Sequence, residues 1–542
     1  MSKKLITFLI VILLASMFLV AFQSPVVGAA ENSWTTKAAM PTARGGLGVA
    51  VVNGKIYAIG GLNDKTHLAV NEEYNPVTDV WTTKTSMPTS RSGFGIAVYQ
   101  NKIYCIGGTT GDSDNFVSGI TGAVEVYDPA TDKWETKTPM PTPRADLCTD
   151  AVNGKIYCIG GKKYWGTDPF YQELNTTEVY DPASNVWTTK SPMPIPVLGA
   201  ASAVLDGKIY IIGGSRHFQM GWDLSTIVSN QVYYPEEDSW STRTGLPTAE
   251  SYATAEATSG VTAPKKIYFL GGSNQTEYSE ETYAYDSVDN DWSTVASMPT
   301  SRVYLAVAVV DDILYAIGGL DGEDWLDVNE QYIPVGYGTV PPVLNVLSPE
   351  NKTYTSSEIP LVLSVNRPTI WMGYSLDDLA NVTVTGDVEL SNLSEGEHRL
   401  TVYVNDTFGN MVSSSNITFF VDTFAPLISV FSPENKTYGK SDILSAFVVN
   451  EPVAWMGYSL DGQDNVTVRE NVTLAVLSEG SHNITFYAID LVGNSGASRT
   501  IYFEIMPFPT VLVVAVVVII TITVATVYLL LKRRKIPSTK VT

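Results

Sequence analysis

Residues 140–161 read MPTPRADLCTDAVNGKIYCIGG. An apolar strand in this stretch runs into Asn153-Gly154, and a second strand, beginning at Lys155, ends in Gly160-Gly161. Asn-Gly accepts the positive φ angles of a tight hairpin turn. Two glycines in succession allow the backbone to pass close to a neighbouring chain segment. The stretch therefore predicts a β-hairpin that ends in a tightly packed loop.

The glycine pair ends an apolar strand six times along the chain. The pairs are Gly60-Gly61, Gly107-Gly108, Gly160-Gly161, Gly213-Gly214, Gly271-Gly272 and Gly318-Gly319. Successive pairs are 47, 53, 53, 58 and 47 residues apart. A period of this length indicates a repeat architecture and not one continuous core.

A tyrosine and a tryptophan seven residues apart follow the glycine pair in five units. They are Tyr74 and Trp81, Tyr127 and Trp134, Tyr180 and Trp187, Tyr233 and Trp240, and Tyr285 and Trp292. A turn between them, such as that at Asp128-Pro129, places the two rings opposite each other across a hairpin. Each unit is therefore predicted to form four short antiparallel strands.

The glycine pairs, the Tyr–Trp spacing and the Met-Pro or matching proline before each unit resemble the kelch repeat over roughly residues 32–335. The resemblance implies a β-propeller with one blade per repeat, hence six blades. Trp34 has no preceding tyrosine in its unit, and Tyr332 has no following tryptophan. We therefore expect the N-terminal strand to complete the sixth blade.

A second repeat begins at Pro342. The sequence SPENKTY at residues 348–354 returns at 432–438, and WMGYSLD at 371–377 returns at 455–461, both with an offset of 84 residues. Alternating apolar residues, as in 398–404, are typical of half-buried strands. The size and pattern predict two β-sandwiches. They look like the Ig-like modules of bacterial and archaeal surface proteins.

Both ends of the chain carry apolar segments. Two lysines, an apolar run over residues 5–22 and small residues at 27–30 predict a secretory signal peptide, with an uncleaved anchor as the alternative. Residues 510–531 carry no charge, and at about 1.5 Å per residue a helix of this length crosses a bilayer core. The basic residues 532–535 that follow predict a cytoplasmic C-terminus.

The sequence thus predicts an all-β chain with one transmembrane helix. The segments are a signal peptide (1–30), a six-bladed kelch-like β-propeller (31–335), a linker (336–341), two Ig-like β-sandwiches (342–425 and 426–509), a transmembrane helix (510–531) and a short cytoplasmic tail (532–542). The expected location is the cell membrane, with the propeller and the Ig-like modules outside the cell. A signal and an anchor of this kind suit an archaeal or bacterial envelope.

The net charge bears on the class of partner, and the cysteine content bears on disulfide formation. The formal net charge of −22 argues against nucleic acid, because binding phosphates requires clustered Lys and Arg. Cys105, Cys148 and Cys158 are the only cysteines. A two-residue turn at Asn153-Gly154 pairs Cys148 with Ile159 and places Cys158 on the opposite face. We therefore expect three free, buried thiols.

Asn-x-Ser/Thr glycosylation acceptors concentrate in the second repeat. Nine lie there, at Asn351, Asn381, Asn392, Asn405, Asn416, Asn435, Asn465, Asn471 and Asn483, and two lie in the predicted propeller, at Asn175 and Asn274. Their density indicates a glycosylated stalk if the host modifies such sites.

No catalytic, cofactor or metal site is predicted. Four scattered histidines lack the short spacing of a metal site. Some kelch-type propellers, such as galactose oxidase, are copper oxidases, but that chemistry requires several converging histidines. Hydrolysis by a pair of carboxylates stays an alternative, since every unit contains Asp and Glu. The acidic stretch 321–324 fits a solvated turn better than a Ca²⁺ loop.

Two sets of residues are candidates for ligand binding. The first set, Arg44, Arg91, Arg144 and Arg302, follows the Met-Pro or matching proline of four units by three residues. The resemblance places this position near the mouth of the channel, where guanidinium groups can bind carboxylate or sulfate. The alternative is that these arginines belong to the repeat and anchor its loop.

The second set lies in two long loops, 162–177 and 215–230. It contains Tyr164, Trp165, Phe170, Tyr171, His217, Phe218 and Trp222. Exposed aromatic rings stack on sugars or anchor protein partners, and the alternative is that they pack the loops onto the propeller.

The predicted function is a cell-surface binding or adhesion protein for an extracellular glycan or protein. A membrane-anchored carbohydrate-active enzyme and a structural envelope component are the alternatives.

Overall fold

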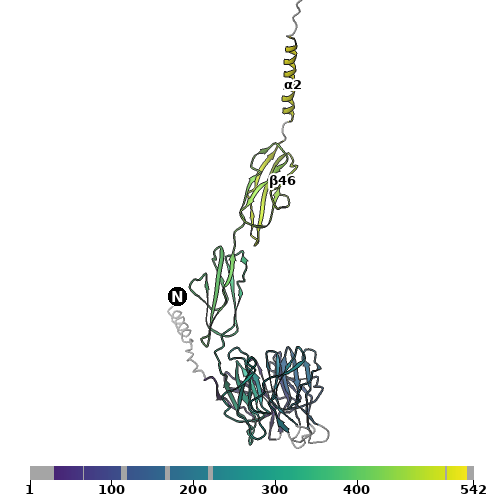
Figure 1. Ribbon diagram of the computed structural model, residues 1–542, viewed down its shortest axis with the longest axis vertical. Helices are drawn as coiled ribbons and strands as arrows, with labels where there is room; N and C mark the ends of the chain where they lie inside the picture. The colour runs from purple at the N-terminus through teal and green to yellow at the C-terminus, as the bar shows by residue number, and fades with distance from the viewer. Residues whose placement is uncertain are drawn as a thin grey trace, which may run out of the picture. The chain divides into compact units, whose positions relative to one another are not determined.

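The computed structural model describes residues 30–64, 66–110, 119–164, 171–217, 224–506 and 510–533 (Figure 1). The regular secondary structure of this part of the chain is nearly all β, with one apolar helix near the C-terminus. It divides into two compact units between Pro341 and Pro342, the residue at which the second sequence repeat begins.

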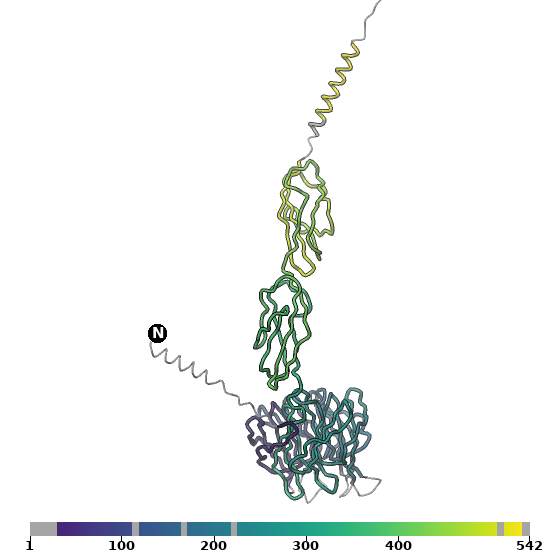
Figure 2. The backbone as a smooth tube through the Cα atoms, turned by 60° about the vertical axis from the view of Figure 1, so that its left-hand side comes forward, coloured from purple at the N-terminus to yellow at the C-terminus, as the bar shows by residue number. Residues whose placement is uncertain are grey.

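The described part of the first unit contains six four-stranded antiparallel sheets, numbered here in chain order (Figure 1; Figure 2). Sheet 1 has β2 (Gly48–Val52), β3 (Lys55–Ile59), β6 (Asn71–Asn75) and β7 (Val80–Lys84); sheet 2 has β8 (Gly95–Tyr99), β9 (Lys102–Ile106), β10 (Val124–Asp128) and β11 (Lys133–Lys137); sheet 3 has β12 (Cys148–Val152), β13 (Lys155–Ile159), β16 (Thr177–Asp181) and β17 (Val186–Lys190).

The remaining three sheets repeat this order. Sheet 4 has β18 (Ala201–Leu205), β19 (Lys208–Ile212), β22 (Asn230–Tyr234) and β23 (Ser239–Thr242); sheet 5 has β24 (Thr254–Ala257), β25 (Ile267–Leu270), β26 (Thr282–Asp286) and β27 (Asp291–Thr294); sheet 6 has β28 (Ala306–Val310), β29 (Ile313–Ile317), β30 (Asn329–Ile333) and β1 (Ser33–Thr36). Three small ribbons follow glycine pairs: β4 (Leu62–Asn63) with β5 (Thr66–His67), β14 (Lys162–Tyr164) with β15 (Tyr171–Glu173), and β20 (Ser215–His217) with β21 (Leu224–Thr226).

The first strand of each sheet lies beside the first strand of the next, and β28 of sheet 6 lies beside β2 of sheet 1. We call these six the inner strands. Apolar cores fill the space between neighbouring sheets. Tyr104 and Ile106 of sheet 2 pack with Ile156 of sheet 3, and Tyr74 of sheet 1 packs with Tyr315 of sheet 6 in the same way. Each sheet is therefore held by both of its neighbours.

The predicted turns and glycine pairs have the expected backbone. Asn153 and Gly154 have φ angles of 48° and 74°, as a tight hairpin turn requires. In the first glycine pair, Gly60 has a φ angle of 60°, and a Cβ atom there would lie 2.7 Å from the carbonyl oxygen of Arg91. Any other residue at this position would collide with the neighbouring sheet.

The Tyr–Trp pairs lie opposite each other across the outer hairpin in sheets 1 to 5, as predicted. In sheet 6 the partners are Trp34 of β1 and Tyr332 of β30, and their ring centroids are 5.0 Å apart. This pairing confirms that the N-terminal strand completes the last sheet. The first and the last described strands of the first unit, β1 and β30, therefore lie side by side.

The three cysteines are free and buried among the described residues. Cys148 pairs with Ile159 across the hairpin, which confirms the predicted register. Burial raises the pKa of each thiol well above its ordinary value, so the thiols stay protonated.

The second unit contains two β-modules and one helix. The first module has β31 (Leu344–Ser348), β32 (Thr353–Tyr354), β33 (Ile359–Val365), β34 (Thr369–Leu376), β35 (Val382–Val384), β36 (Val388–Leu390), β37 (Gly396–Asp406), β38 (Met411–Ser413) and β39 (Ile417–Val421). The second has β40 (Ile428–Ser432), β41 (Thr437–Tyr438), β42 (Ile443–Leu444), β43 (Ala446–Val449), β44 (Val453–Leu460), β45 (Val466–Val468), β46 (Thr473–Leu474), β47 (Gly480–Asp490), β48 (Ser495–Ala497) and β49 (Ile501–Ile505). Both modules pack two layers of strands around an apolar core.

Helix α2 (Thr510–Arg533) follows the second module. Its segment Val514–Arg533 has a mean hydropathy of 2.8 over its most apolar window, so it is long and apolar enough to cross a membrane. Lys532 and Arg533 form its last turn.

Candidate functional site

One backbone hydrogen bond joins each sheet of the first unit to the next, near the start of the inner strands. The N–H groups of Gly93, Asp146, Gly199, Tyr252 and Tyr304 each donate to the carbonyl of the preceding member of the set, at 2.7–3.1 Å, and Gly46 donates to Tyr304 at 2.8 Å. The series returns to its first member. We call these six residues the hydrogen-bonded ring.

All six residues of the hydrogen-bonded ring have left-handed backbone, with φ between 52° and 60°. Glycine occupies three of the positions, and Asp146, Tyr252 and Tyr304 occupy the others. A bulky residue in this conformation costs about 1–3 kcal/mol, and such strain concentrates at functional sites. The three side chains therefore mark this face of the first unit as a candidate site.

The two tyrosines of the ring pack against each other beside a cavity. Their ring centroids are 4.6 Å apart at an interplanar angle of 45°. The cavity has a volume of about 330 Å³ and is lined by both tyrosines, Tyr278 and the serines 215, 251 and 273. Burial, followed by the nearby Asp146 carboxylate, raises the pKa of Tyr304 to about 12. Burial also raises the pKa of Tyr252, so both hydroxyl groups stay protonated beside the cavity.

Two residues of the predicted aromatic loops join this group. The Tyr171 ring lies 5.4 Å from the His217 ring, and Lys162 Nζ lies 5.1 Å from the Tyr171 centroid. Lys162 also forms a salt bridge with Asp146 at 2.6 Å. Burial lowers the pKa of Lys162, but the Asp146 carboxylate outweighs this and holds the pKa above its ordinary value, so Lys162 stays charged.

The position of His217 is fixed by Glu173 of the neighbouring ribbon β14–β15. Its backbone N–H donates to Glu173 Oε1 at 2.7 Å, and its Nδ1 contacts the same oxygen. We call Asp146, Lys162, Tyr171, His217, Tyr252 and Tyr304 the tyrosine face. It combines four aromatic rings in two tilted pairs with one charged pair, which suits a polar ligand that also offers apolar or planar surface.

Trp165, Phe170, Phe218 and Trp222 lie outside the described residues. The backbone of Tyr164 pairs with Tyr171 in the ribbon β14–β15. Eight of the predicted glycosylation sites are exposed, and Asn274, Asn405 and Asn483 are half-buried.

The four arginines lie inside the sheets, each with none of its surface exposed. Their guanidinium groups form salt bridges with Glu72, Glu125, Glu178 and Glu330, at 2.6, 2.9, 2.5 and 2.6 Å. Each also donates to a carbonyl of the second strand of its own sheet, as Arg144 does to Cys158 at 2.7 Å. Burial lowers the pKa of Arg302 to about 10. The geometry supports the alternative in which these arginines anchor the repeat.

Sheets 4 and 5 lack this salt bridge. Val197 and Glu250 stand at the arginine position, and Gln231 and Tyr283 stand at the glutamate position. Gln231 instead hydrogen-bonds the backbone of Ile195 through both ends of its amide, at 2.8 and 3.0 Å. Burial raises the pKa of Glu250 to about 7.

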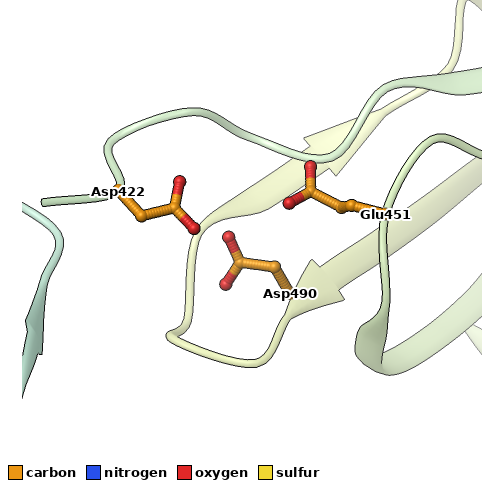
Figure 3. A group of neighbouring side chains, drawn as sticks. All are labelled: Asp422, Glu451 and Asp490. Carbon is orange, nitrogen blue, oxygen red and sulfur yellow. The ribbon is translucent and has the colours of Figure 1, made fainter. Parts of the chain in front are cut away.

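Three carboxylates of the second unit lie close together (Figure 3). Asp422, Glu451 and Asp490 each place one oxygen within 4.8 Å of the others, so they could hold a metal ion. Sequence reasoning missed this group. One signal for it was present: 84 residues before Glu451 stands Arg367, which pairs with the buried Asp406 at 3.2 Å. The first module thus has the cation Arg367 at the position where the second module has the carboxylate Glu451.

Glu451→Arg is expected to raise the melting temperature of the second unit, because it replaces repulsion of Asp490 by the pairing found in the first module. The gain is about 1 kcal/mol for a partly exposed pair. Calorimetry on the full chain measures it in metal-free buffer. Glu451→Gln, which removes repulsion without adding a cation, should give a smaller gain, and a lower melting temperature for Glu451→Arg would contradict the argument.

The acidic stretch near Asp321 forms a turn. Asp321 Oδ1 accepts hydrogen bonds from the N–H groups of Glu323 and Asp324, at 3.1 and 2.9 Å. These bonds use the carboxylate within its own loop, as in a solvated Asx turn.

Comparison with known proteins identifies the repeats. The KLHDC2/KLHL20/DRC7 Kelch-repeats domain matches residues 27–161 and 126–319. Similar proteins include Kelch-like protein 25 of Xenopus tropicalis (29% identical over 180 residues, 33% of this chain and 28% of that protein), Kelch-like protein terF of Aspergillus terreus (28% over 185 residues, 33% and 39%) and Kelch-like protein 26 of Danio rerio (32% over 229 residues, 41% and 34%).

The matched stretch covers about a third of the length of each of these relatives. The family match itself covers more than half of the present chain and includes all six glycine pairs. The chain therefore belongs to the kelch-repeat family.

Proposed function

We propose that this chain is a cell-surface binding protein whose first unit is a six-bladed propeller that recognises an extracellular partner. A protein partner is favoured, because kelch-repeat domains generally mediate protein–protein binding. The two β-modules would act as an Ig-like stalk and helix α2 as the membrane anchor. The relatives are typically non-enzymatic interaction proteins, which favours binding over catalysis.

The closed series of contacts between sheets supports the propeller. Six inner strands lie side by side in order, with the sixth beside the first. The hydrogen-bonded ring passes through all six sheets and returns to its start. A sheet arrangement with free edges at both ends would leave one of these bonds unmade.

The tyrosine face is the observation that carries the binding proposal. Tyr252 and Tyr304 keep a left-handed backbone where three equivalent positions have glycine, and their rings, in contact at a tilted angle, border a cavity. Large aromatic side chains at such a place are typical of residues that dominate the energy of an interface.

Replacing both tyrosines by asparagine is expected to weaken partner binding roughly 30-fold, equivalent to about 2 kcal/mol. Asparagine tolerates left-handed backbone, so the hydrogen-bonded ring is retained. The measurement uses the full chain in detergent on an array of extracellular proteins and glycans, followed by titration of the bound partner.

Val77→Asn is the matched control, since Val77 is 92% exposed on a distant turn of sheet 1. Unchanged binding by the tyrosine double variant would refute the assignment of the face. Binding only to glycans would replace the protein partner by a carbohydrate one. Turnover of a polysaccharide without stable binding would favour the carbohydrate-active enzyme.

A further inference from the structure

A second cavity lies at the centre of the six inner strands. It has a volume of about 520 Å³ and is lined by residues of β2, β8, β12, β18, β24 and β28. Ser259, Thr262, Asp311 and Asp312 stand at its rim. We call it the central cavity. It is separate from the tyrosine face, and the residues that line the two sites do not overlap.

The wall of the central cavity departs from the repeat at two places. In every sheet the third residue of the inner strand pairs with a tyrosine of the second strand, so the six positions are structurally equivalent. Sheets 1, 2, 4 and 6 have alanine there, at Ala50, Ala97, Ala203 and Ala308, whereas sheet 3 has Asp150 and sheet 5 has Glu256. Two carboxylates therefore replace methyl groups in a wall whose other side chains on the inner strands are aliphatic apart from Thr149.

The two carboxylates lack a balancing cation. Asp150 Oδ2 is buried without a hydrogen-bond partner among the described residues, and Glu256 Oε1 accepts one bond, from Ala257 N–H at 3.2 Å. None of the described residues that line the cavity is Lys, Arg or His. An uncompensated buried carboxylate costs several kcal/mol unless it is protonated or paired.

Burial raises the pKa of Asp150 to about 7. It also raises the pKa of Glu256 to about 7, with a further contribution from the Asp150 charge. Near neutral pH both groups are therefore partly protonated, and a cation that enters the cavity displaces protons from them.

The size and wall of the central cavity indicate the kind of cation. A volume of this order is typical of small-molecule sites, about 300–1,000 Å³. Ca²⁺ takes about six to eight oxygen ligands. Beside Asp150 and Glu256, the described side chains of the wall offer only the Thr149 hydroxyl, and the other oxygen-bearing side chains, Ser259, Thr262, Asp311 and Asp312, stand at the rim. A protonated amine needs fewer acceptors, and an attached aliphatic chain gains from contact with Val49, Val98 and Val309.

We propose that the central cavity binds an alkylammonium group, with its charged head between Asp150 and Glu256 and its aliphatic chain along the alanine and valine wall. The group can come from a free amine or from a lysine side chain of a peptide. Both sources present the same chemistry to the cavity, and the test below separates them.

The affinity depends on pH because the ammonium group competes with protons. The titratable groups that face Asp150 are Glu256 across the cavity and the thiols of Cys148 and Cys158 in its own sheet, with Asp311 and Asp312 at the rim. Burial raises the pKa of the Cys158 thiol, which stays neutral. Burial raises the pKa of the Cys148 thiol, which stays neutral. Burial also acts to raise the pKa of Asp312, but four backbone N–H groups of residues 259–263 outweigh it and keep this carboxylate ionised. Raising the pH through about 7 ionises Asp150 and Glu256 and strengthens binding.

Isothermal titration calorimetry on the full chain in detergent tests the proposal with pentylamine, a Gly-Gly-Lys-Gly-Gly peptide and CaCl₂ as probes. Pentylamine is expected to bind about tenfold more tightly at pH 8 than at pH 6, with release of protons into the buffer. Equal binding by the lysine peptide assigns a peptide as the natural source, and binding by pentylamine alone assigns a free amine. Binding of Ca²⁺ without binding of either amine overturns the proposal, as does the absence of binding by all three probes.

Asp150→Ala and Glu256→Ala give the residue that four other sheets already have, so the fold is retained. Each is expected to weaken pentylamine binding at least about tenfold. Glu250→Gln is the control, because Glu250 is another buried carboxylate with a pKa of about 7 and does not line the cavity. Equal loss of binding in the control and in the alanine variants would show that the effect is not specific to this pair.

Discussion

Replacing Arg144 by valine is expected to lower the free energy of unfolding of the first unit by about 3–5 kcal/mol, the usual cost of removing one partner from a buried ion pair. Arg144 has none of its surface exposed, and its guanidinium group lies 2.5 Å from Glu178. The valine leaves Glu178 buried without its countercharge, and it also leaves the carbonyl of Cys158 without the donor at 2.7 Å.

The double variant Arg144→Val, Glu178→Gln should recover most of this loss. It reproduces the Val197 and Gln231 combination of sheet 4, where the glutamine hydrogen-bonds the backbone and no charge is buried. Guanidinium unfolding followed by tryptophan fluorescence measures both variants. A double variant no more stable than the single one would show that the salt bridge is not the main contribution of Arg144.

Replacing Trp34 by alanine is expected to cost about 3 kcal/mol, because the indole fills space between sheets 5 and 6. Its ring contacts that of Tyr332 at a tilted angle, with centroids 5.0 Å apart, and its Nε1–H donates to the carbonyl of Ala296 at 2.8 Å. Limited proteolysis should then cut near β1 and β30 before it cuts elsewhere, since sheet 6 loses its outer strand.

Thr36→Ala in the same strand is the control for Trp34→Ala. Thr36 is exposed, so its loss should change the unfolding midpoint little. If Trp34→Ala unfolds at the same denaturant concentration as Thr36→Ala, the N-terminal strand does not hold the last sheet in place.

The fold of the first unit could be predicted because its signals are local and repeated. A hairpin turn such as Asn153-Gly154 and a Tyr–Trp pair seven residues apart each depend on a few neighbouring residues. Six copies remove the ambiguity that one copy would leave. Even the long-range pairing of Trp34 with Tyr332 followed from the repeat, because each completes the motif that the other lacks.

The role of the arginines could not be settled by their position alone. Whether Arg144 points to the channel or into the sheet depends on Glu178, which is 34 residues away in sequence. A signal was nevertheless present: each of the four arginine sheets has a glutamate two residues before its tyrosine, and the two sheets without arginine have Gln231 and Tyr283 there.

Tyr171 and His217 of the tyrosine face were among the predicted ligand-binding residues. The other residues of the candidate sites were missed because nothing in their local sequence distinguishes them. Tyr252 and Tyr304 become informative only when aligned with the glycines of the hydrogen-bonded ring. Asp150 and Glu256 become informative only beside the alanines of the other inner strands. The length of the 58-residue interval between the fourth and fifth glycine pairs also has a second cause. In sheet 5 the loop 258–266 joins the first two strands, where sheet 1 has a two-residue turn.

The pairing of β1 with β30 has a consequence for how the chain reaches its native state. Tyr332 hydrogen-bonds Asn32 across a separation of 300 residues, so sheet 6 stays incomplete until almost the whole first unit has been synthesised. During that time residues 33–36 have no partner strand, and β30, once it has been synthesised, presents an unpaired strand edge until these residues pair with it. The same segment of a second molecule fits that edge equally well. Crowding of nascent chains therefore favours exchange of the N-terminal strand between copies, which would yield domain-swapped dimers with native contacts throughout.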